Sequence, residues 1–246
     1  MRSLTLHHAK ANAEDCRRPA PRYGAAMLFE KLTEVLDPEP HDAALNMAID
    51  EVLLRAAREP LLRVYRWTKR AVSFGYFTRI SELDPVANGW EAVRRWTGGG
   101  VVPHGEDVTY TLIVPATHAF ARLPATESYR RIHGCIAEVL RGAGVKTTLA
   151  AATAAKISAG CFENPAEADV LAGEQKIAGA AQRRTRWGLL HQGSVQGIAR
   201  VADFGRRLAP SFAEEITQRP LGGEEIEAAR VLAQEKYASE SWLRRF

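Results

Sequence analysis

The sequence is poor in cysteine, with only Cys16, Cys135 and Cys161 among its 246 residues. These cysteines form no CxxC pair and no Cys/His spacing suited to zinc, which excludes a disulfide framework and a structural zinc site. The chain also lacks the GxxxxGK[ST] and GxGxxG patterns, so its glycines do not follow the spacing of the common phosphate-binding loops. Any cysteine that takes part in chemistry here acts singly.

The sequence also lacks long apolar runs and a strong excess of one charge. No stretch reaches the roughly 18 apolar residues of a membrane span, and the first residues lack the apolar core of a secretory signal. We therefore expect a cytoplasmic protein that does not bind a membrane. The formal charge is +4, from 33 basic and 29 acidic residues. This mild excess does not require a nucleic-acid partner and suits an acidic protein partner equally well. We expect protein partners and no nucleic-acid partner.

The composition is otherwise that of a globular chain. With 46% hydrophobic residues the chain can bury one substantial core, so we expect a single domain over residues 27–246. Residues 1–26 show no apolar periodicity. We interpret them as a mobile N-terminal extension, or as the product of a start codon assigned too early.

Hydrophobic periodicity predicts many strands with few helices between them. Strand-like runs occupy residues 27–35, 61–67, 71–77, 91–96 and 108–115, and two or three antiparallel strands follow within 168–197. Helices are expected from the N-cap Asp42 to near Pro60, from about Thr126 to Gly142, and over 198–210 and 224–246. Cys135 lies beside the apolar face of the second helix and is interpreted as core. This order predicts an α+β fold in which mixed or antiparallel sheets are flanked by helices.

A glycine triplet follows the run 91–96, in the sequence RRWTGGGVVPH from Arg94 to His104. Adjacent glycines let backbone N–H groups approach a ligand closely and adopt φ angles that are closed to other residues. The triplet therefore fits either a ligand-binding loop or a flexible hairpin turn.

A single lysine stands in front of a run of very small residues in KIAGAAQR, residues 176–183. On a regular strand Lys176, Ala178 and Ala180 point to one face, and Gly179 and Ala181 point to the other. Such small residues leave a groove that an alkyl chain could fill, with Lys176 at its entrance facing a carbonyl oxygen or a phosphate. The alternative is a surface lysine on a tightly packed strand.

A cysteine occurs in a loop-like stretch just before these strands, AGCFENP at residues 159–165. The neighbouring glycine and proline favour an exposed position for Cys161. A thiolate accepts acyl groups well, and a thioester divides one acyl transfer into two easier steps. Cys161 is therefore either a nucleophile or a structural cysteine.

Four separate blocks of the sequence fit one family pattern. They are LRVYRW with SFGYF (62–67 and 73–77), RRWTGGGVVPH with a following Thr-Tyr (94–104 and 109–110), KIAGAAQR (176–183) and HQGS (191–194). Together they resemble the biotin/lipoate protein ligase superfamily, specifically its lipoate ligase and octanoyltransferase branch. The resemblance implies the catalytic-domain fold of that superfamily. It also implies no C-terminal accessory domain, because the chain stops soon after Trp242.

The resemblance implies acyl transfer to a protein lysine. Members of the branch attach octanoyl or lipoyl groups to a lysine of a lipoyl-carrier protein. Ligases use ATP and an acyl-adenylate, whereas cysteine-dependent octanoyltransferases take octanoyl from acyl carrier protein through a cysteine thioester. Cys161 lies fifteen residues before Lys176, where such a transferase would have its cysteine. The main hypothesis is therefore an octanoyltransferase; the alternatives are an ATP-dependent lipoate ligase and a non-catalytic relative that binds acyl groups or their carriers.

The resemblance also implies the site residues and partners. Cys161 would be the nucleophile, and Lys176 would orient the acyl carbonyl. The residues implied to bind substrate are Arg95, Gly98, Gly99, Gly100, His104, Tyr110, Ala178, Gly179, Ala180, His191, Gly193 and Ser194. His104 and His191 are candidates by residue type for a general base. The transferase would need no metal or other cofactor, whereas the ligase would need ATP and Mg.

The implied partners are acyl carrier protein as the donor and a lipoyl domain or a glycine-cleavage H-type protein as the acceptor, with the chain acting as a monomer. Some residues depart from the family pattern. Gly100 stands where the transferases typically have arginine, Gly105 follows His104 in place of aspartate, and His191-Gln192 inverts the expected order. Ala166 and Glu167 replace a serine and an aromatic residue. These departures concern the donor and the acceptor rather than the fold.

Overall fold

The computed structural model describes residues 27–83, 89–155, 160–198 and 203–246. The extension expected over residues 1–26, which contains Cys16, lies outside the described residues. No helix within the described ranges is long and apolar enough to span a bilayer.

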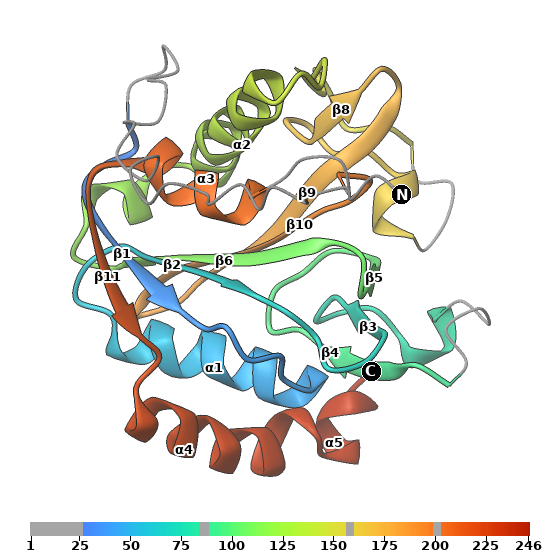
Figure 1. Cartoon of the computed structure of the whole chain (residues 1–246). Helices are drawn as coiled ribbons and strands as arrows, with labels where there is room; N and C mark the ends of the chain where they lie inside the picture. Colours follow the sequence, from blue (N-terminus) through green and yellow to red (C-terminus); the bar gives the residue numbers. More distant parts are fainter. Residues whose placement is uncertain (1–26, 84–88, 156–159, 199–202) are drawn as a thin grey trace, which may run out of the picture.

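Two β-sheets lie side by side (Figure 1). The large sheet has the strand order β11-β1-β2-β6-β10-β9-β8-β7. Its strands are β1 (Phe29–Leu36), β2 (Leu61–Tyr65), β6 (Val108–Pro115), β7 (Thr148–Leu149), β8 (Val170–Ala172), β9 (Gln175–Arg184), β10 (Gly188–Val195) and β11 (Ala213–Pro220). The small sheet has the order β4-β3-β5, with β3 (Ala71–Phe74), β4 (Glu91–Arg94) and β5 (Val101–His104).

Both sheets are mixed. In the large sheet β1 runs parallel to β2 and to β11, and all other neighbours are antiparallel. In the small sheet β3 is parallel to β4 and antiparallel to β5. Mixed or antiparallel sheets were predicted, and both sheets are mixed; the antiparallel strands expected within residues 168–197 are confirmed.

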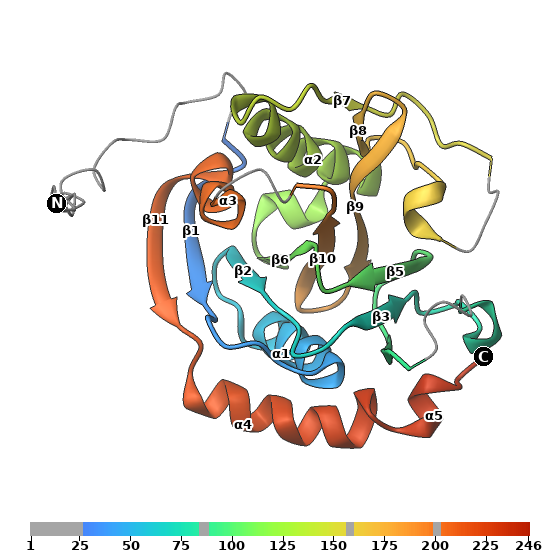
Figure 2. The ribbon, with the colours of Figure 1, turned by 45° about the vertical axis from the view of Figure 1, so that its right-hand side comes forward.

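Helices cover both faces of the large sheet (Figure 2). On one face lie α2 (Ala125–Gly142) and α3 (Phe204–Phe212). On the other lie α1 (Ala43–Ala56), α4 (Gly223–Leu232), a π-helical turn (Ala233–Tyr237) and α5 (Glu240–Leu243). Short 3-10 turns occupy η2 (Ile80–Glu82), η4 (Ala119–Arg122) and η5 (Cys161–Glu163). The predicted α+β fold, with sheets flanked by helices, is confirmed.

Helix α1 begins where its sequence predicts. The Asp42 side chain accepts a hydrogen bond of 2.8 Å from the backbone N–H of Leu45, which satisfies one of the free donors of the first turn. The helix ends at Ala56, four residues before Pro60. Cys135 of α2 is only 5% exposed and packs in the core between α2 and the sheet, as expected.

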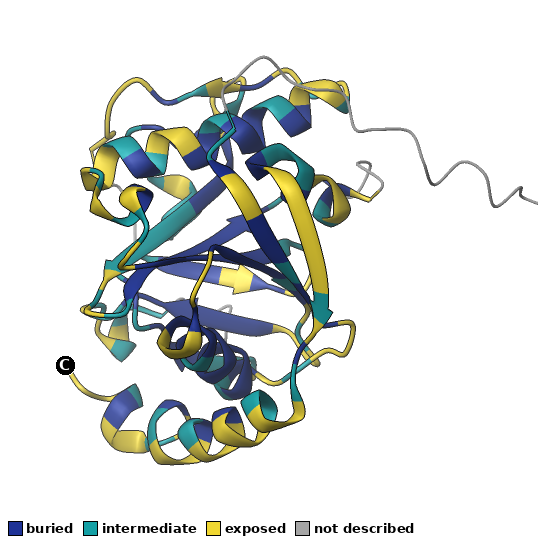
Figure 3. Cartoon of the chain, turned by 90° about the vertical axis from the view of Figure 1, so that its left-hand side faces the viewer, coloured by how far each residue is buried: buried dark blue, intermediate teal, exposed yellow. Residues whose placement is uncertain are grey.

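Three strands were not predicted: β5, β11 and the two-residue strand β7. β5 directly follows the glycine triplet and consists of only four residues, one of them Pro103. β11 is a polar strand, AEEITQRP, at the edge of the large sheet, where most of its side chains are exposed (Figure 3). An edge strand that faces solvent on several sides shows no apolar alternation, so periodicity does not detect it. The helix expected over 198–210 begins only at Phe204, and residues 199–202 lie outside the described ranges.

Candidate active site

Cys161 and Lys176 are in contact. The Nζ of Lys176 lies 3.4 Å from the Sγ of Cys161 and donates a hydrogen bond of 2.9 Å to the backbone carbonyl of the same cysteine. Cys161 begins the 3-10 turn η5, and a β-bridge between Gly160 and Val101 holds this turn against β5. The thiol is thus presented by a short turn that is anchored on both sides.

The Lys176 ammonium is fully engaged. Its third contact is an ion pair of 2.7 Å with Asp169, and both side chains are almost completely buried. Asp169 in turn accepts a hydrogen bond of 2.5 Å from the Tyr129 hydroxyl and one of 2.6 Å from the backbone N–H of Ala166. The three N–H groups of the ammonium thus meet three acceptors, namely the carbonyl and the sulfur of Cys161 and the carboxylate of Asp169, which keep it directed at the cysteine. A buried carboxylate therefore fixes the lysine, and the lysine faces the sulfur.

A β-bulge determines the direction of Lys176. Val170 pairs with Ala178 and Leu171 pairs with Lys176, so Ile177 is an additional residue in β9. The alternation expected for residues 176–183 is therefore wrong at its start. A Cβ placed on Gly179 would lie 2.3 Å from Cε of Lys176, which shows that the lysine side chain crosses over this glycine. Any larger residue at position 179 would occupy the space of the lysine.

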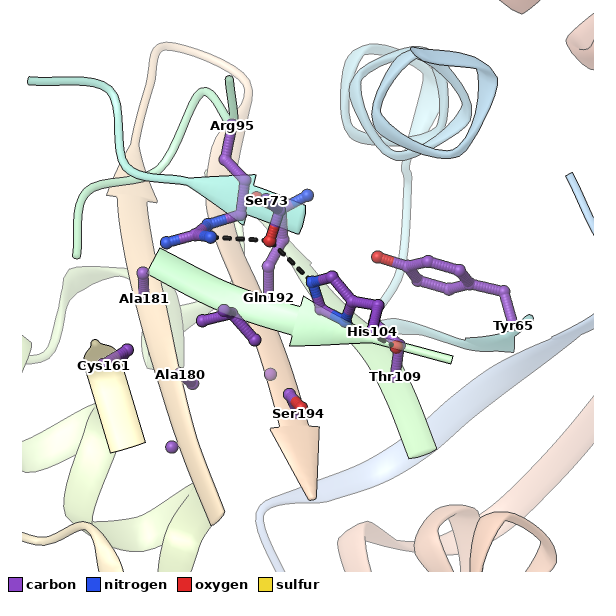
Figure 4. A pocket seen from close by; sticks show the side chains of 13 residues that line it. Tyr65, Ser73, Arg95, His104, Thr109, Cys161, Ala180, Ala181, Gln192 and Ser194 are labelled. Carbon is purple, nitrogen blue, oxygen red and sulfur yellow. Dashed lines mark hydrogen bonds between the residues drawn. The ribbon is translucent and has the colours of Figure 1, made fainter. Parts of the chain in front are cut away.

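A narrow pocket and a wider depression meet at Cys161. The inner pocket lies between the large and the small sheet and is lined by Tyr65, Ser73, Arg95, Val102, His104, Thr109, Cys161, Gly179, Ala180, Ala181, Gln192, Gly193 and Ser194. In Figure 4, Cys161 lies at one end of it beside Ala180, and Tyr65 lies at the other. The outer depression, about 350 Å³ in volume, is lined by Lys176, Tyr129, Gly99, Gly100 and Thr78 among others, and shares Cys161 and Ala180 with the inner pocket.

The glycine triplet forms a tight loop against the loop that follows β3. Gly99 has a φ of +90°, and a Cβ on Gly75 would lie 1.9 Å from the Gly99 carbonyl oxygen. Both positions therefore require glycine. The residue before the triplet, Thr97, donates a hydrogen bond of 2.8 Å to the Gln192 side chain on β10. The triplet is thus a fixed loop at the rim of the depression, not a flexible turn.

A line of hydrogen bonds runs along one wall of the inner pocket (Figure 4). Arg95 donates to Ser73 Oγ over 2.7 Å, Ser73 Oγ lies 2.6 Å from His104 Nε2, and His104 Nδ1 lies 2.8 Å from Asp107. The His104 imidazole and several hydrogen bonds lower the pKa of Asp107 to about 2 despite burial. Asp107 is thus the carboxylate that pairs with His104 at this wall of the pocket.

Arg95 is a buried cation beside the cysteine. It donates hydrogen bonds of 3.0 Å to the carbonyls of Gly98 and Gly100, and no carboxylate in the described ranges lies within ion-pair distance of it. Burial lowers the pKa of this guanidinium, and negative charge on Cys161 acts in the opposite direction. The sulfur is therefore within electrostatic reach of two cations, Arg95 and Lys176.

Three expected substrate-binding residues lie on the other face of the sheet. Tyr110 and His191 are buried beneath α2 with 3.1 Å between the hydroxyl and Nε2, and Ala178 is in the same core. Burial lowers the pKa of His191 well below its usual range. None of the three lines the inner pocket or the outer depression. The structure therefore does not bring His191 to the cysteine as a base, whereas Gly193 and Ser194 of the same strand do line the pocket.

Four residues of the site were not anticipated. Asp169, Tyr129, Ser73 and Asp107 come from four separate segments and meet only in the folded chain. Tyr129 lies within the helix expected from about Thr126 to Gly142, and only its hydroxyl group indicates a role in the site. Asp107 offered a weak signal, because a carboxylate three residues after a histidine can reach the ring.

Comparisons with known proteins identify the family of the chain. Residues 42–222 match the family model for the lipoyl protein ligase A/B catalytic domain. The chain is 34% identical to octanoyltransferase LipM of Kyrpidia tusciae over 216 residues, which is 77% of this chain and 79% of that protein. It is also 34% identical to octanoyltransferase LipM of Oceanobacillus iheyensis over 169 residues, which is 65% of this chain and 62% of the length of that relative.

Solved structures show the same fold. A lipoate-protein ligase A bound with ATP superposes with a TM-score of 0.69 at 22% identity, covering 88% of this chain and 99% of that one. A bi-partite lipoate protein ligase from Thermoplasma acidophilum superposes with a TM-score of 0.66 at 22% identity, covering 88% of this chain and 96% of that one. With its fold, its glycine loop and the matched residues in agreement, the chain belongs to the lipoyl protein ligase A/B catalytic domain family.

Proposed function

We propose that the protein is an octanoyltransferase that carries its acyl group as a thioester on Cys161 and delivers it to a lysine of a lipoyl-carrier protein. The observation that carries this proposal is the 3.4 Å contact between Lys176 Nζ and Cys161 Sγ, where the inner pocket meets the outer depression. The identity to octanoyltransferases LipM supports the same activity.

The reaction divides into two acyl transfers. In the first, the Cys161 thiolate attacks the carbonyl carbon of an octanoyl thioester; a new C–S bond forms, and the donor leaves as a thiol once it gains a proton. In the second, the neutral amine of the acceptor lysine attacks the acyl-enzyme; a C–N bond forms, the bond to Cys161 breaks, and the amine proton is released. Cys161 returns to its starting state, so no net oxidation or ATP cleavage is required.

The cations beside the sulfur suit both steps. Each step places negative charge on the carbonyl oxygen, and preorganised donors stabilise such charge more than water does. Lys176 can shift its weakest hydrogen bond, the one to Cys161 Sγ, toward this oxygen while Asp169 still holds it. The glycine loop places backbone groups on the opposite side of the same space.

The inner pocket, about 30 Å³ in volume, opens into the outer depression of about 350 Å³, and the two together offer room for a short alkyl chain. Gly179, Ala180, Ala181 and Gly193 contribute almost no side-chain volume to the walls of the inner pocket. Burying about seven methylene groups at roughly 0.8 kcal/mol each stabilises a bound octanoyl group by about 5 to 6 kcal/mol before ordering costs. The proposed donor is octanoyl-acyl carrier protein, and the proposed acceptor is a lipoyl domain or an H-type protein. No cofactor is proposed for this reaction.

Intact-protein mass spectrometry tests the proposal directly. The wild type and Cys161→Ala are mixed with octanoyl-acyl carrier protein in the absence of ATP. We expect a hydroxylamine-labile octanoyl adduct on the wild type only, and its loss when a lipoyl domain is added. An acyl-adenylate that forms only with ATP and free acid, and survives Cys161→Ser, would establish a lipoate ligase instead. Tight acyl binding without any adduct or product would indicate a non-catalytic relative.

A further inference from the structure

A surface of alternating arginine and aromatic side chains adjoins the outer depression. The Arg183 guanidinium lies over the rings of Tyr76 and Trp96, with its Cζ 5.0 and 4.7 Å from the two ring centres. Trp96 lies 6.2 Å from Trp187, which carries Arg186 at 4.5 Å. We call this set, together with Phe77, Arg245 and Phe246, the arginine–aromatic surface.

The other end of the surface is apolar and exposed. Phe77 is 73% exposed and Phe246 is 49% exposed, with their ring centres 5.5 Å apart. Arg245 lies 5.4 Å from the centre of the Tyr76 ring, which connects these phenylalanines to the arginines. In Figure 2 the C-terminal end accordingly lies beside the loop that follows β3. Large exposed aromatic side chains at this density mark an interaction site.

The positive charge of the surface is not neutralised within the chain. Among the described residues, no carboxylate lies within 4.0 Å of Arg183, Arg186 or Arg245. The nearby Glu51 is buried and is already shared by Arg55 and Lys236. Three guanidinium groups without a carboxylate partner among the described residues, beside two exposed phenylalanines, complement a partner that is acidic and also offers apolar contacts.

The surface leads directly to the cysteine. Thr78, the neighbour of Phe77, donates a hydrogen bond of 3.1 Å to the Gly99 carbonyl, and both residues line the outer depression with Cys161. On the other side, Arg183 donates to the Trp96 carbonyl over 3.0 Å and follows Ala181 of the pocket wall by two residues. A protein docked here can therefore extend a flexible arm into the depression.

We propose that the arginine–aromatic surface docks the acyl donor, an acidic carrier protein that presents its thioester on a phosphate-bearing arm. The assignment rests on the proposed function. Guanidinium groups bind phosphate and carboxylate groups through paired hydrogen bonds, which fits the donor.

The test is the double variant Arg186→Glu/Arg245→Glu, with Phe77→Ser as a separate variant. Arg207→Glu is the matched control, because it reverses the same charge on an exposed position of α3, at the opposite side of the molecule. Loading of Cys161 is timed by mass spectrometry with octanoyl-acyl carrier protein and with octanoyl-N-acetylcysteamine, a small donor without a carrier. Binding of the carrier protein to the Cys161→Ala form of each variant is measured independently of catalysis.

For the carrier donor we expect the double variant to load about 100-fold more slowly and to bind correspondingly more weakly, and Phe77→Ser to load about 10-fold more slowly. Loading from the small donor and the behaviour of Arg207→Glu stay at the wild-type level. Unchanged carrier binding would overturn the inference, as would normal loading followed by slow transfer to a lipoyl domain, which would assign the surface to the acceptor. A wild type that binds the carrier through this surface but is never loaded would contradict the proposed function alone.

Discussion

The two described cysteines of this chain have the same chemistry and opposite surroundings. Cys135 lies in the core beneath α2, where burial raises the pKa of its thiol to about 12. Cys161 lies on an anchored turn, half-buried, with the Lys176 ammonium at 3.4 Å and a pocket on either side. A thiol thus becomes a candidate nucleophile through access and neighbouring cations, because only the thiolate attacks.

Exchanging each cysteine tests the comparison most strongly. Cys161→Ala is expected to lower octanoyl transfer about 10³-fold or more, because the covalent route is lost. Cys135→Ala is expected to leave the rate within about twofold and to cost about 1 kcal/mol of unfolding free energy, because it leaves a small cavity. Steady-state transfer and denaturant titration measure the two effects. A Cys161→Ala protein that retains octanoyl transfer would show that Cys161, like Cys135, is not the nucleophile.

Removing the ammonium makes the surroundings of Cys161 more like those of Cys135. Lys176→Met leaves Asp169 buried without its cation, so we expect a loss of about 3–5 kcal/mol in unfolding free energy, together with a large loss of Cys161 acylation. The double variant Lys176→Met/Asp169→Asn separates the two roles. It should recover most of the stability and none of the acylation; recovery of both would show that the lysine is only structural.

Each cysteine has a glycine nearby that allows a matched substitution. Gly179→Ala puts a methyl group 2.3 Å from Cε of Lys176, so the ammonium must move, and we expect acylation to fall about 10- to 100-fold. Gly134→Ala, beside Cys135 on α2, meets no atom within 4 Å and should stabilise the protein by about 0.5–1 kcal/mol. Single-turnover loading of Cys161 and thermal unfolding are measured for both variants. Equal effects of the two substitutions on loading would contradict the position of Lys176.

The smallest expected effect is a pH dependence that comes from Cys135. Its pKa is raised from 9.0 to about 12 in the folded protein, so the folded state holds its proton more tightly. The stability that results is fully present below pH 9 and is lost as the pH rises toward 12. We expect the wild type to lose about 1 kcal/mol more than Cys135→Ala between pH 8 and pH 10 in urea titrations. Parallel curves for the two proteins would show that Cys135 is not buried.

Local signals predicted most of the fold. Asp42 marked the start of α1, and the alternation within residues 168–197 predicted two or three antiparallel strands, of which the structure contains three. β11 was not predicted, because most of its side chains face solvent and show no apolar alternation. Its place beside β1 depends on backbone pairing, which side-chain periodicity does not reveal.

The candidate site was predicted in its outline and not in its contacts. The family resemblance associated Cys161 with Lys176, and the two are in contact. Asp169 and Tyr129, which hold the lysine, come from a loop and a distant helix, and no spacing rule connects them. Strand alternation grouped Lys176 with Ala178 rather than with Gly179, because a bulge is set by the pairing of two strands and not by one strand alone.

The additional residue Ile177 has a further consequence for how this strand can vary. It shifts the alternation of β9, so that Lys176 lines the outer depression while Gly179 and Ala181 line the inner pocket that adjoins it at Cys161. The number of residues between Lys176 and Gly179 therefore determines whether the lysine reaches Cys161. Losing one residue would turn the ammonium away from the sulfur while leaving every other residue type intact.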